Sequence, residues 1–391
     1  MPGALPEDPM IRSIVTAARK AQISRRAMLL GTAGTIGAAS AVSLTACAPA
    51  GESLTWANWA LYIDEDDNGD YPTLDRFEDE SGIRVSYQVD VDDNNTYYAK
   101  VKDQLALGQD IGADTVCLTD WMAARLIRQD FVQKLGRGSI KNSSNLLPSL
   151  EQPDWDPGRE FSLPWQGGFA GICWNKEKLP KGLKNVSDLW APELKGRVGV
   201  LSEMRDTIGL IMLEQGVDIS GDFSAEDFAK ANDVFREQVE SGQIRNIKGN
   251  SYIDDLTNED TLAAIVWSGD VTTLNAESGD KWEFMIPETG GTLWNDNFVI
   301  PNGSSKLKNV QKLIDYYYDP AVAAEVAAWV NYITPVTGAK EEAEKIDPDL
   351  ADNQLIFPNE ETLASVKIFR GLTPDEEQSF GDQFQSVLLG V

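Results

Sequence analysis

The sequence predicts an α/β protein of two or more domains. The chain has 391 residues, which exceeds the size of one average domain. Apolar runs typical of strands alternate with amphipathic runs typical of helices. The composition, 42% hydrophobic and 25% charged, is that of a globular protein rather than of a disordered or fibrous one. These features together predict parallel or mixed sheets with helices on both faces.

The segment from residue 54 to residue 129 repeats a strand–helix order three times. Pro72 begins the first helix and Gly82 ends it, and Asn95 or Thr96 is expected to cap the second. The strands are expected at 54–59, 83–87 and 115–118, and the helices at 72–81, about 95–107 and 121–129. Residues 142–159, rich in Ser, Asn and Pro, predict an ordered loop.

A second α/β set follows this loop. Its apolar runs predict strands at 168–172, 198–201 and 262–267. Helices are expected at 206–215 and at 225–240, the second lying between Ser224 and Gly242. The chain from Ser305 onward is expected to be mostly helical.

The charge balance excludes several functions. The chain carries 34 basic and 62 acidic side chains, a net charge of -28, and no His. Without His, neither a Ser-His-Asp nor a Cys-His nucleophile can form, and metal sites that need imidazole are excluded. The acidity argues against nucleic acid as a partner, since Lys and Arg carry phosphate binding. It leaves cationic ligands open.

The N-terminal segment 1–46 is interpreted as an export signal. Arg25 and Arg26 precede an apolar run, as in twin-arginine signals. The run ends at Leu44-Thr45-Ala46-Cys47, which is typical of a lipobox and makes Cys47 the expected lipidation site. The alternative is an N-terminal anchor that stays uncleaved. Either interpretation places the rest of the chain outside the cytoplasm, tethered to the membrane.

The other two cysteines, Cys117 and Cys173, lie in apolar runs. An exported protein can form a disulfide, but the spacing does not require one. We therefore expect both to be buried free thiols.

Aromatic and acidic side chains gather where the predicted strands end, which is where α/β sheets bind ligands. The candidates are Trp59, Tyr62, Thr119, Trp121, Glu203, Asp206, Trp267, Asp270, Trp294 and Asp296. Each Trp could instead belong to the core, and Glu203 and Asp206 could merely complement a helix N-terminus capped by Ser202. Aromatic faces with carboxylates are what an alkylammonium guest needs.

The acidic turn after the first strand has the spacing of a calcium-binding loop. Asp64, Asp66, Asn68, Asp70 and Asp75 occupy loop positions 1, 3, 5, 7 and 12. A strand precedes the turn, however, so the helix–loop–helix context is missing. A solvated acidic turn is favoured, and no metal is expected.

The paired acids also allow an enzyme interpretation. A carboxylate pair could serve glycoside hydrolysis in a secreted glycosidase. Acids beside Trp equally describe a cleft that binds sugar. We therefore expect no catalytic residues and no cofactor.

The chain resembles the solute-binding lipoproteins of spermidine/putrescine ABC importers from about Ser53 to its C-terminus. Order and spacing of several short pieces carry the resemblance. These pieces are Asn58-Trp59-x-x-Tyr62, Ser81-Gly82-Ile83-x-Val85, Tyr98-Ala99-Lys100, Pro164-Trp165-x-x-Gly168-x-x-Gly171-Ile172, Leu189-Trp190-x-Pro192-Glu193-Leu194-Lys195-Gly196, Ile265-Val266-Trp267-x-Gly269, Pro287-x-x-Gly290-Gly291-x-x-Trp294-x-Asp296-x-x-x-Ile300-Pro301 and Tyr332-x-Thr334-Pro335.

The resemblance implies a two-lobe periplasmic-binding-protein-like fold of type II, in which two α/β lobes close like a hinge on the ligand. The crossovers are expected near 165–171 and 267–270. The implied division is a signal at 1–46, lobe 1 at 47–168, lobe 2 at 169–267, a return to lobe 1 at 268–315 and a helical segment at 316–391 that belongs mainly to lobe 2.

The resemblance also implies a receptor that binds a polyamine and delivers it to an ABC permease with its ATPase, as a lipid-anchored monomer. A sugar or another solute remains the alternative ligand. The family's aromatic walls match Trp59, Tyr62, Trp121, Trp267 and Trp294. Its acids match Glu203 and Asp206, with Asp270 and Asp296 adjacent, and Thr119 matches a small hydroxyl residue. The sequence departs from the family at Glu203, at Trp121, at Gln166, which is also a candidate, and at the insert 64–70.

Overall fold

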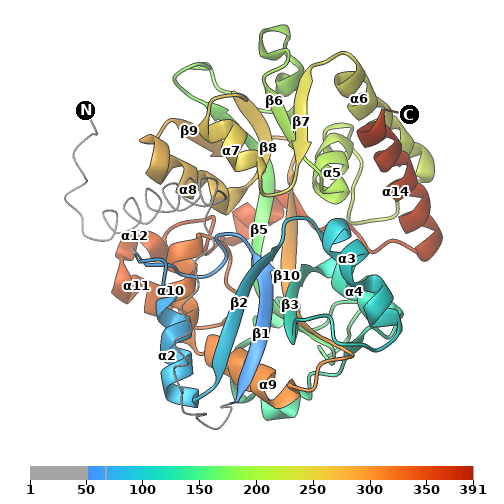
Figure 1. The fold of residues 1–391 in the computed structure, drawn as a ribbon. Helices are drawn as coiled ribbons and strands as arrows, with labels where there is room; N and C mark the ends of the chain where they lie inside the picture. The colour runs from blue at the N-terminus through green and yellow to red at the C-terminus, as the bar shows by residue number, and fades with distance from the viewer. Residues whose placement is uncertain (1–51, 67, 391) are drawn as a thin grey trace, which may run out of the picture.

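The computed structural model describes residues 52–66 and 68–390. The export signal and the lipobox at Cys47 lie outside these residues. Two long strands, β5 (Ser162–Asn175) and β10 (Gly291–Pro301), run antiparallel to each other through the middle of the molecule. Each end of this pair belongs to a different lobe (Figure 1). The two-lobe α/β fold predicted from the sequence is therefore confirmed.

Lobe 1 contains the first strands of the chain and a group of helices that returns later. Its elements are β1 (Ser53–Trp59), α2 (Pro72–Ser81), β2 (Arg84–Val91), α3 (Asn94–Ala106), β3 (Thr115–Thr119), α4 (Asp120–Arg128), β4 (Val132–Gln133), α9 (Leu307–Tyr317), α10 (Pro320–Val330), α11 (Ala339–Ile346) and α12 (Pro348–Ala351). The expected loop 142–159 contains short 3-10 turns.

Lobe 2 contains the middle of the chain and the C-terminal helix. Its elements are β6 (Val198–Leu201), α5 (Met204–Glu214), α6 (Ala225–Glu240), β7 (Ile244–Lys248), α7 (Tyr252–Thr257), β8 (Ala263–Trp267), α8 (Ser268–Ser278), β9 (Trp282–Met285) and α14 (Pro374–Leu389). Before α14 the chain forms α13 (Glu360–Ala364) and the short strand β11 (Val366–Lys367). Strand β11 pairs with β10.

The two lobes repeat one sheet pattern. In lobe 1 the strand order is β2-β1-β3-β10-β4, where β1 is parallel to β2 and β3, and β10 is antiparallel to β3 and β4. In lobe 2 the order is β7-β6-β8-β5-β9, again with three parallel strands followed by an antiparallel crossover strand. The carboxyl ends of β1, β3, β6 and β8 consequently point toward the boundary between the lobes.

Each lobe has its own hydrophobic core. The first core collects buried residues from 54–165 and 298–343, and the second from 170–282 and 369–387. This differs from the predicted return to lobe 1 at residue 268, because α8 and β9 pack in the second core and the chain crosses back only with β10. It also differs for residues 316–343, which pack in the first core. We propose these core ranges as the lobe division.

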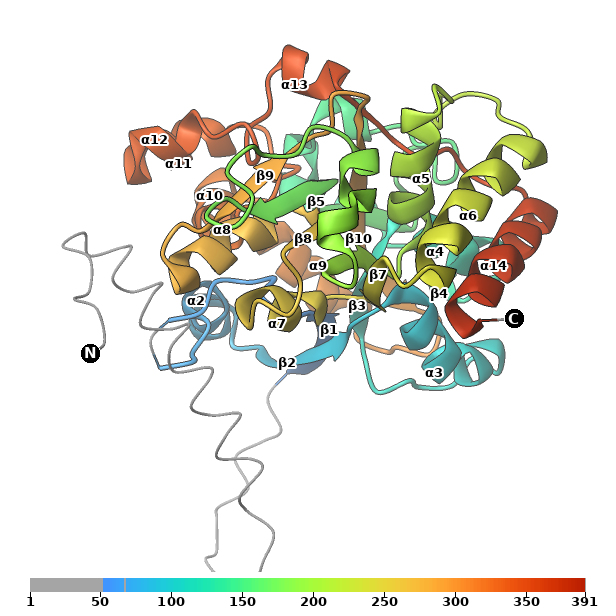
Figure 2. The same cartoon turned by 90° about the horizontal axis from the view of Figure 1, so that it is seen from above.

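Helices cover both faces of the sheet. Figures 1 and 2 both show α5, α6 and α14 on one side and α8, α10 and α11 on the other. In the part of the chain that the structure describes, none of these helices combines the length and apolar character needed to cross a bilayer.

Two helix starts differ from the sequence expectation. Asp93, rather than Asn95 or Thr96, caps α3, because its side chain accepts a hydrogen bond from the backbone N–H of Thr96. Glu203, rather than Ser202, caps α5 by accepting from the backbone N–H of Arg205. Ser202 instead donates to Asp93 across the lobe boundary at 3.0 Å.

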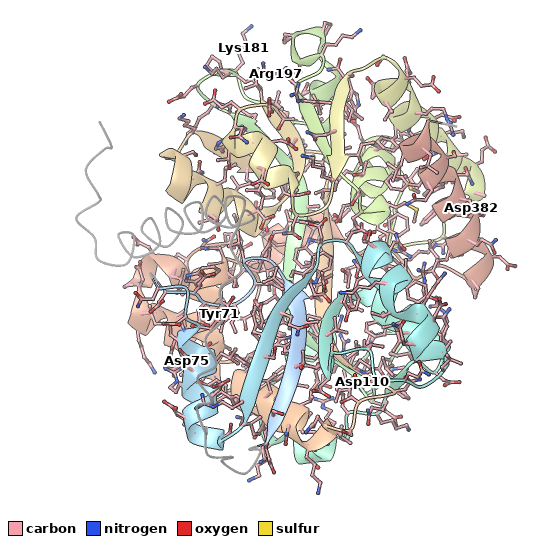
Figure 3. The ribbon with its side chains drawn as sticks, in the orientation of Figure 1. Tyr71, Asp75, Asp110, Lys181, Arg197 and Asp382 are labelled. Carbon is pink, nitrogen blue, oxygen red and sulfur yellow. The ribbon has the colours of Figure 1, made fainter. Side chains whose placement is uncertain are left out.

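The thiols and the acidic turn have structural roles. Cys117 and Cys173 are buried and free in different cores, as predicted. In the turn, Asp64 is buried and accepts from Thr73, while Asp66 accepts from the backbone N–H groups of Asn68 and Asp70. Asp75 lies on α2 (Figure 3). Among the described residues, no group of three or more His, Cys, Asp or Glu side chains is arranged to hold a metal ion.

Candidate functional site

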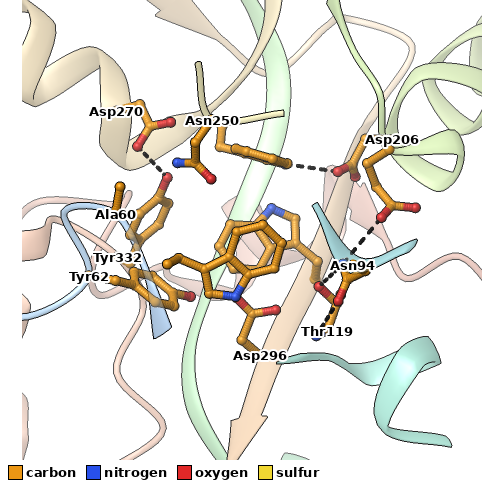
Figure 4. A pocket seen from close by; sticks show the side chains of 13 residues that line it. Ala60, Tyr62, Asn94, Thr119, Asp206, Asn250, Asp270, Asp296 and Tyr332 are labelled. Carbon is orange, nitrogen blue, oxygen red and sulfur yellow. Dashed lines mark hydrogen bonds between the residues drawn. The ribbon is translucent and has the colours of Figure 1, made fainter. Parts of the chain in front are cut away.

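A cavity lies between the lobes, and the space in it that no atom fills, part of it open to solvent, is about 420 Å³ (Figure 4). Its wall is formed by Trp59, Ala60, Tyr62, Asn94, Thr119, Glu203, Asp206, Asn250, Trp267, Asp270, Trp294, Asp296 and Tyr332. Nine of the eleven predicted ligand-binding residues are in this wall. Within the described residues, the wall includes four acidic side chains and no Lys or Arg.

The sheet pattern explains why these residues meet. Trp59, Thr119 and Trp267 are the last residues of β1, β3 and β8. The carboxyl ends of parallel strands meet at one edge of a sheet, and both lobes turn this edge toward the cavity. The crossover strand β10 adds Trp294 and Asp296 from the middle of the molecule.

Aromatic rings form a continuous wall around the cavity. The ring centroids of Trp59 and Trp267 lie 6.3 Å apart, as do those of Trp267 and Trp294. Tyr332 continues the series, 5.2 Å from Trp294 and 5.6 Å from Tyr62. All four pairs are edge-to-face, an arrangement that lets faces of some rings point into the cavity.

Gly168 makes room for this wall. A Cβ atom at residue 168 would lie 2.7 Å from the ring of Trp294 and 2.7 Å from the ring of Tyr332. Any larger residue would therefore displace one of the two rings. The close approach gives a physical reason for a glycine at this point of β5.

Two of the three acids of lobe 2, Asp206 and Asp270, are held by hydrogen bonds from buried donors. Asp206 accepts from Nε1 of Trp267 at 2.9 Å and from the hydroxyl of Thr292 at 2.5 Å. Asp270 accepts from the hydroxyls of Tyr252 at 2.6 Å and Tyr332 at 2.9 Å. Each oxygen of these two carboxyl groups therefore has a donor from the protein.

The other two acids are held more loosely. Glu203 accepts from the Asn94 side chain at 3.4 Å and from the backbone N–H of Arg205 at 3.3 Å. Asp296 is buried, and although hydrogen bonding to the Thr119 and Tyr62 hydroxyls lowers its pKa, its Oδ1 atom has no partner of good geometry among the described residues.

Burial dominates the electrostatics of the cavity. Loss of solvation raises the pKa of Glu203 to about 7, of Asp296 to about 7 and of Asp270 to about 6, and it also raises the pKa of Asp206. Hydrogen bonds from Tyr252 and Tyr332 oppose the rise at Asp270, and the neighbouring Asp206 adds to the rise at Glu203. A cation between these groups would favour their ionised forms.

The lobes touch across the mouth of the cavity. Asn94 and Ser202 form hydrogen bonds to residues of the opposite lobe. Gly249 of lobe 2 lies against Asp92 of lobe 1 so closely that a Cβ atom would be 2.3 Å from the Asp92 carbonyl oxygen. The structure is therefore a closed arrangement of the two lobes.

Two predicted residues lie outside the cavity wall. The Trp121 ring is sandwiched between the guanidinium groups of Arg205, 4.1 Å away, and Arg125, 5.0 Å away. Gln166 is buried on β5 and pairs in register with Asp296. Arginine side chains therefore surround Trp121, and Gln166 lies beside the cavity wall without being part of it.

Four wall residues were not among the candidates. Tyr332 lies in a quoted motif, Tyr332-x-Thr334-Pro335, so its aromatic ring was a usable signal. Asn94 and Asn250 are ordinary polar residues near helix starts, and Ala60 has no side-chain chemistry. Tyr252, behind the wall, was also missed.

Two α/β lobes of this strand order, joined by crossover strands around an enclosed cavity, define a periplasmic-type solute-binding protein. The chain belongs to the bacterial extracellular solute-binding protein family, whose model matches residues 73–357. The prediction of a solute-binding receptor is confirmed at this level.

Curated relatives extend the likeness. The spermidine/putrescine-binding periplasmic protein of Escherichia coli (strain K12) is 25% identical over 313 residues, covering 80% of this chain and 84% of that protein. The putrescine-binding periplasmic protein PotF of the same organism is 25% identical over 348 residues, covering 84% of this chain and 90% of that protein.

Solved structures support the fold. A putative spermidine/putrescine ABC transporter protein from Listeria monocytogenes superposes with a TM-score of 0.74 at 24% identity, over 87% of this chain and all of that chain (100%). A solute-binding protein from Thermotoga lettingae TMO bound with alpha-D-tagatose gives 0.65 at 17% identity, over 87% of this chain and 95% of that one. The fold alone therefore does not decide the ligand.

Proposed function

We propose that the protein is the receptor of an ABC importer and that it binds a polyamine such as putrescine or spermidine in the cavity between its lobes. One observation carries the proposal: four buried carboxyl groups from both lobes face a cavity walled by aromatic rings and without a basic residue in its described wall.

The proposal explains an energetic conflict in the site. Placing four carboxyl groups out of water is costly, and the raised pKa values of Glu203, Asp270 and Asp296 reflect that cost. Ammonium groups of a ligand would offset it by pairing with the ionised acids. The aromatic wall would cover the methylene groups between them and attract each cation by its ring faces.

Two groups of acids suit a ligand with a charge at each end. Asp206 stands at one side of the cavity, with Glu203 three residues before it in the chain, and Asp270 stands at the other side beside Tyr332 (Figure 4). A terminal ammonium group within hydrogen-bond reach of either group of acids would donate to its carboxylate oxygens. We propose as ligand-binding residues Trp59, Tyr62, Thr119, Glu203, Asp206, Trp267, Asp270, Trp294, Asp296 and Tyr332.

The names of the relatives support the same ligand class. The E. coli proteins are named as spermidine/putrescine-binding and putrescine-binding. A receptor role would need no catalytic residue. The proposal includes delivery of the ligand to an ABC permease. It also includes export by the twin-arginine signal and a lipid anchor at Cys47, which rest on the N-terminal sequence.

A thermal-shift screen of purified protein with amines, sugars and amino acids tests the ligand class. We expect putrescine or spermidine to raise the melting temperature, because a ligand that binds only the folded state stabilises it. A shift with a sugar and none with the amines would show that the fold serves a neutral solute. Steady hydrolysis of a glycan would instead favour the glycosidase interpretation.

A further inference from the structure

Outside the cavity, charged side chains from both lobes converge on Glu377. This residue lies on α14 of lobe 2, and its Oε1 is 3.1 Å from Nη2 of Arg125, while its Oε2 is 2.6 Å from Nη2 of Arg128. Both of these arginines lie on α4 of lobe 1. Arg205 of lobe 2 approaches the same Oε1 atom to 3.5 Å. We call Glu377 and these three arginines the Glu377 clasp.

The clasp is more than an exposed ion pair. The Glu377 and Arg205 side chains are each 10% exposed, and that of Arg125 is 19% exposed. Desolvated charge pairs interact more strongly than exposed ones, and breaking one of them leaves a charge without compensation. One carboxylate is therefore held by three guanidinium groups in a chain that is otherwise strongly acidic.

The clasp is connected to the cavity through Arg205. Nη1 of Arg205 lies 4.0 Å from Oε1 of Glu203, which is in the cavity wall. The ring of Trp121 fills the space between Arg205 and Arg125, so the guanidinium groups of the two lobes are spaced by one indole. Opening the lobes would separate Arg125 and Arg128 from Glu377.

The charge of the cavity opposes closure. Asp296 on the lobe 1 side faces Asp206 and Asp270 of lobe 2 across the cavity. When these acids are ionised, their repulsion favours the open arrangement until a cation lies between them. The Glu377 clasp supplies an attraction between the same two lobes, outside the cavity.

We propose that Glu377 is a positioning residue for ligand retention: it holds the lobes closed through Arg125 and Arg128. The proposal rests on the proposed polyamine function only for the choice of probe. Its direct consequence concerns the rate of ligand release, because the clasp has to break before the lobes can open.

The test compares Glu377→Gln with Asp375→Asn, which removes the same charge at an exposed residue in the first turn of the same helix. Spermidine release and association are measured by stopped-flow tryptophan fluorescence. We expect Glu377→Gln to speed release about tenfold and to change association less than about twofold. Asp375→Asn is expected to match the wild type in both rates. Release from Glu377→Gln at the wild-type rate overturns the proposal.

A double-mutant cycle separates the clasp from a general loss of stability. Arg128→Gln should also speed release, and combining it with Glu377→Gln should add little, because both changes remove the same contact. A merely structural role for Glu377 would give independent effects that multiply in the double variant. Multiplying effects would overturn the proposal.

A third measurement does not depend on the ligand. If calorimetry shows no binding of spermidine to the wild type, the proposed ligand is wrong, and X-ray scattering alone tests the clasp. At about 20 mM salt we expect Glu377→Gln to have a larger radius of gyration than the wild type, because the variant lacks the pairs of the clasp. At about 1 M salt this difference should shrink, since salt screens the pairs in the wild type. Equal radii in all cases would contradict the clasp.

Discussion

On the lobe 2 side of the cavity, both carboxyl oxygens of Asp206 and of Asp270 accept hydrogen bonds from buried donors of the protein. On the lobe 1 side, Oδ1 of Asp296 has no partner among the described residues. The two sides thus hold similar groups in different ways. Hydrogen bonds fix Asp206 and Asp270 in the closed arrangement, whereas Asp296 needs a proton or a cation to offset its burial.

This contrast suggests a division of labour. Asp206 and Asp270 cannot turn away without leaving a Trp or Tyr donor unpaired, so they define where a cation can sit. Asp296 gains most from a cation, since it is the acid with an unpaired buried oxygen. Asp206 and Asp270 would then orient the ligand, and the pairing of Asp296 with a cation would favour the closed arrangement of the lobes.

The largest effect is expected for Asp206→Asn. The amide has one acceptor oxygen for two donors, Trp267 and Thr292, and it lacks the charge. We expect a loss of about 2–5 kcal/mol in putrescine affinity by calorimetry, together with a fall of about 1–2 kcal/mol in the free energy of unfolding without ligand. Asp103→Asn, an exposed change on α3, is the control. Unchanged affinity in Asp206→Asn would remove this residue from the site.

Asp296→Asn should separate the two sides most clearly. We expect an affinity loss of about 2–4 kcal/mol. The free energy of unfolding without ligand should rise by about 1–2 kcal/mol at about pH 8, because the variant no longer buries a carboxyl group whose pKa is about 7. Denaturant unfolding of both Asn variants checks the sign. If both lose stability equally, the contrast between the lobes is wrong.

The pH dependence should have opposite signs for stability and for binding. The pKa is about 7 for Glu203 and Asp296 and about 6 for Asp270, whereas unfolded carboxyl groups titrate near 4. Between about pH 4 and 7 the folded protein therefore holds more protons than the unfolded one, and its free energy of unfolding falls as pH rises.

Over the same range the acids ionise, so affinity for a diammonium ligand should rise about tenfold or more between about pH 5.5 and 7.5. Calorimetric titration at several pH values measures this rise, and Asp296→Asn should reduce it. A flat pH profile would argue that these acids do not pair with the ligand.

A smaller effect is expected for Gly249→Ala, which tests whether the two sides must meet. The added Cβ would clash with the Asp92 carbonyl oxygen only when the lobes are closed. We expect about 1–3 kcal/mol of lost affinity, the usual cost of an overpacked contact, and no change in unfolding without ligand. Gly182 and Gly216 lie at positive φ and make poor controls, so Gly371→Ala, outside the helices and with open space at its Cβ, is the matched change. Full affinity in Gly249→Ala would mean that closure is not needed.

Much of the fold could be predicted because its signals are local. Pro72 and Gly82 bound α2, and the apolar run that ends at Trp267 forms β8. Strand ends then brought most of the aromatic and acidic candidates to one cavity. The return of the chain through β10 could not be predicted in this way, because it depends on which core receives α8 and β9.

The residues that failed to line the cavity show the limit of sequence reasoning. Trp121 stands at a strand end like Trp59, but Arg125 and Arg205 occupy its two faces. That sandwich depends on the position of α5 beside α4, which are far apart in the sequence. Tyr252 and Asn250 come from the loop and helix after β7, whose approach to the cavity is equally a tertiary property.

The central claim is that the cavity selects positive charge. Calorimetric titration of the purified protein with putrescine and with 1,4-butanediol tests it most directly, since the two molecules have the same carbon chain and differ in their charged ends. The account predicts saturable binding of the diamine and none of the diol. Binding of the diol with equal strength, or of neither while a neutral solute binds, would contradict it.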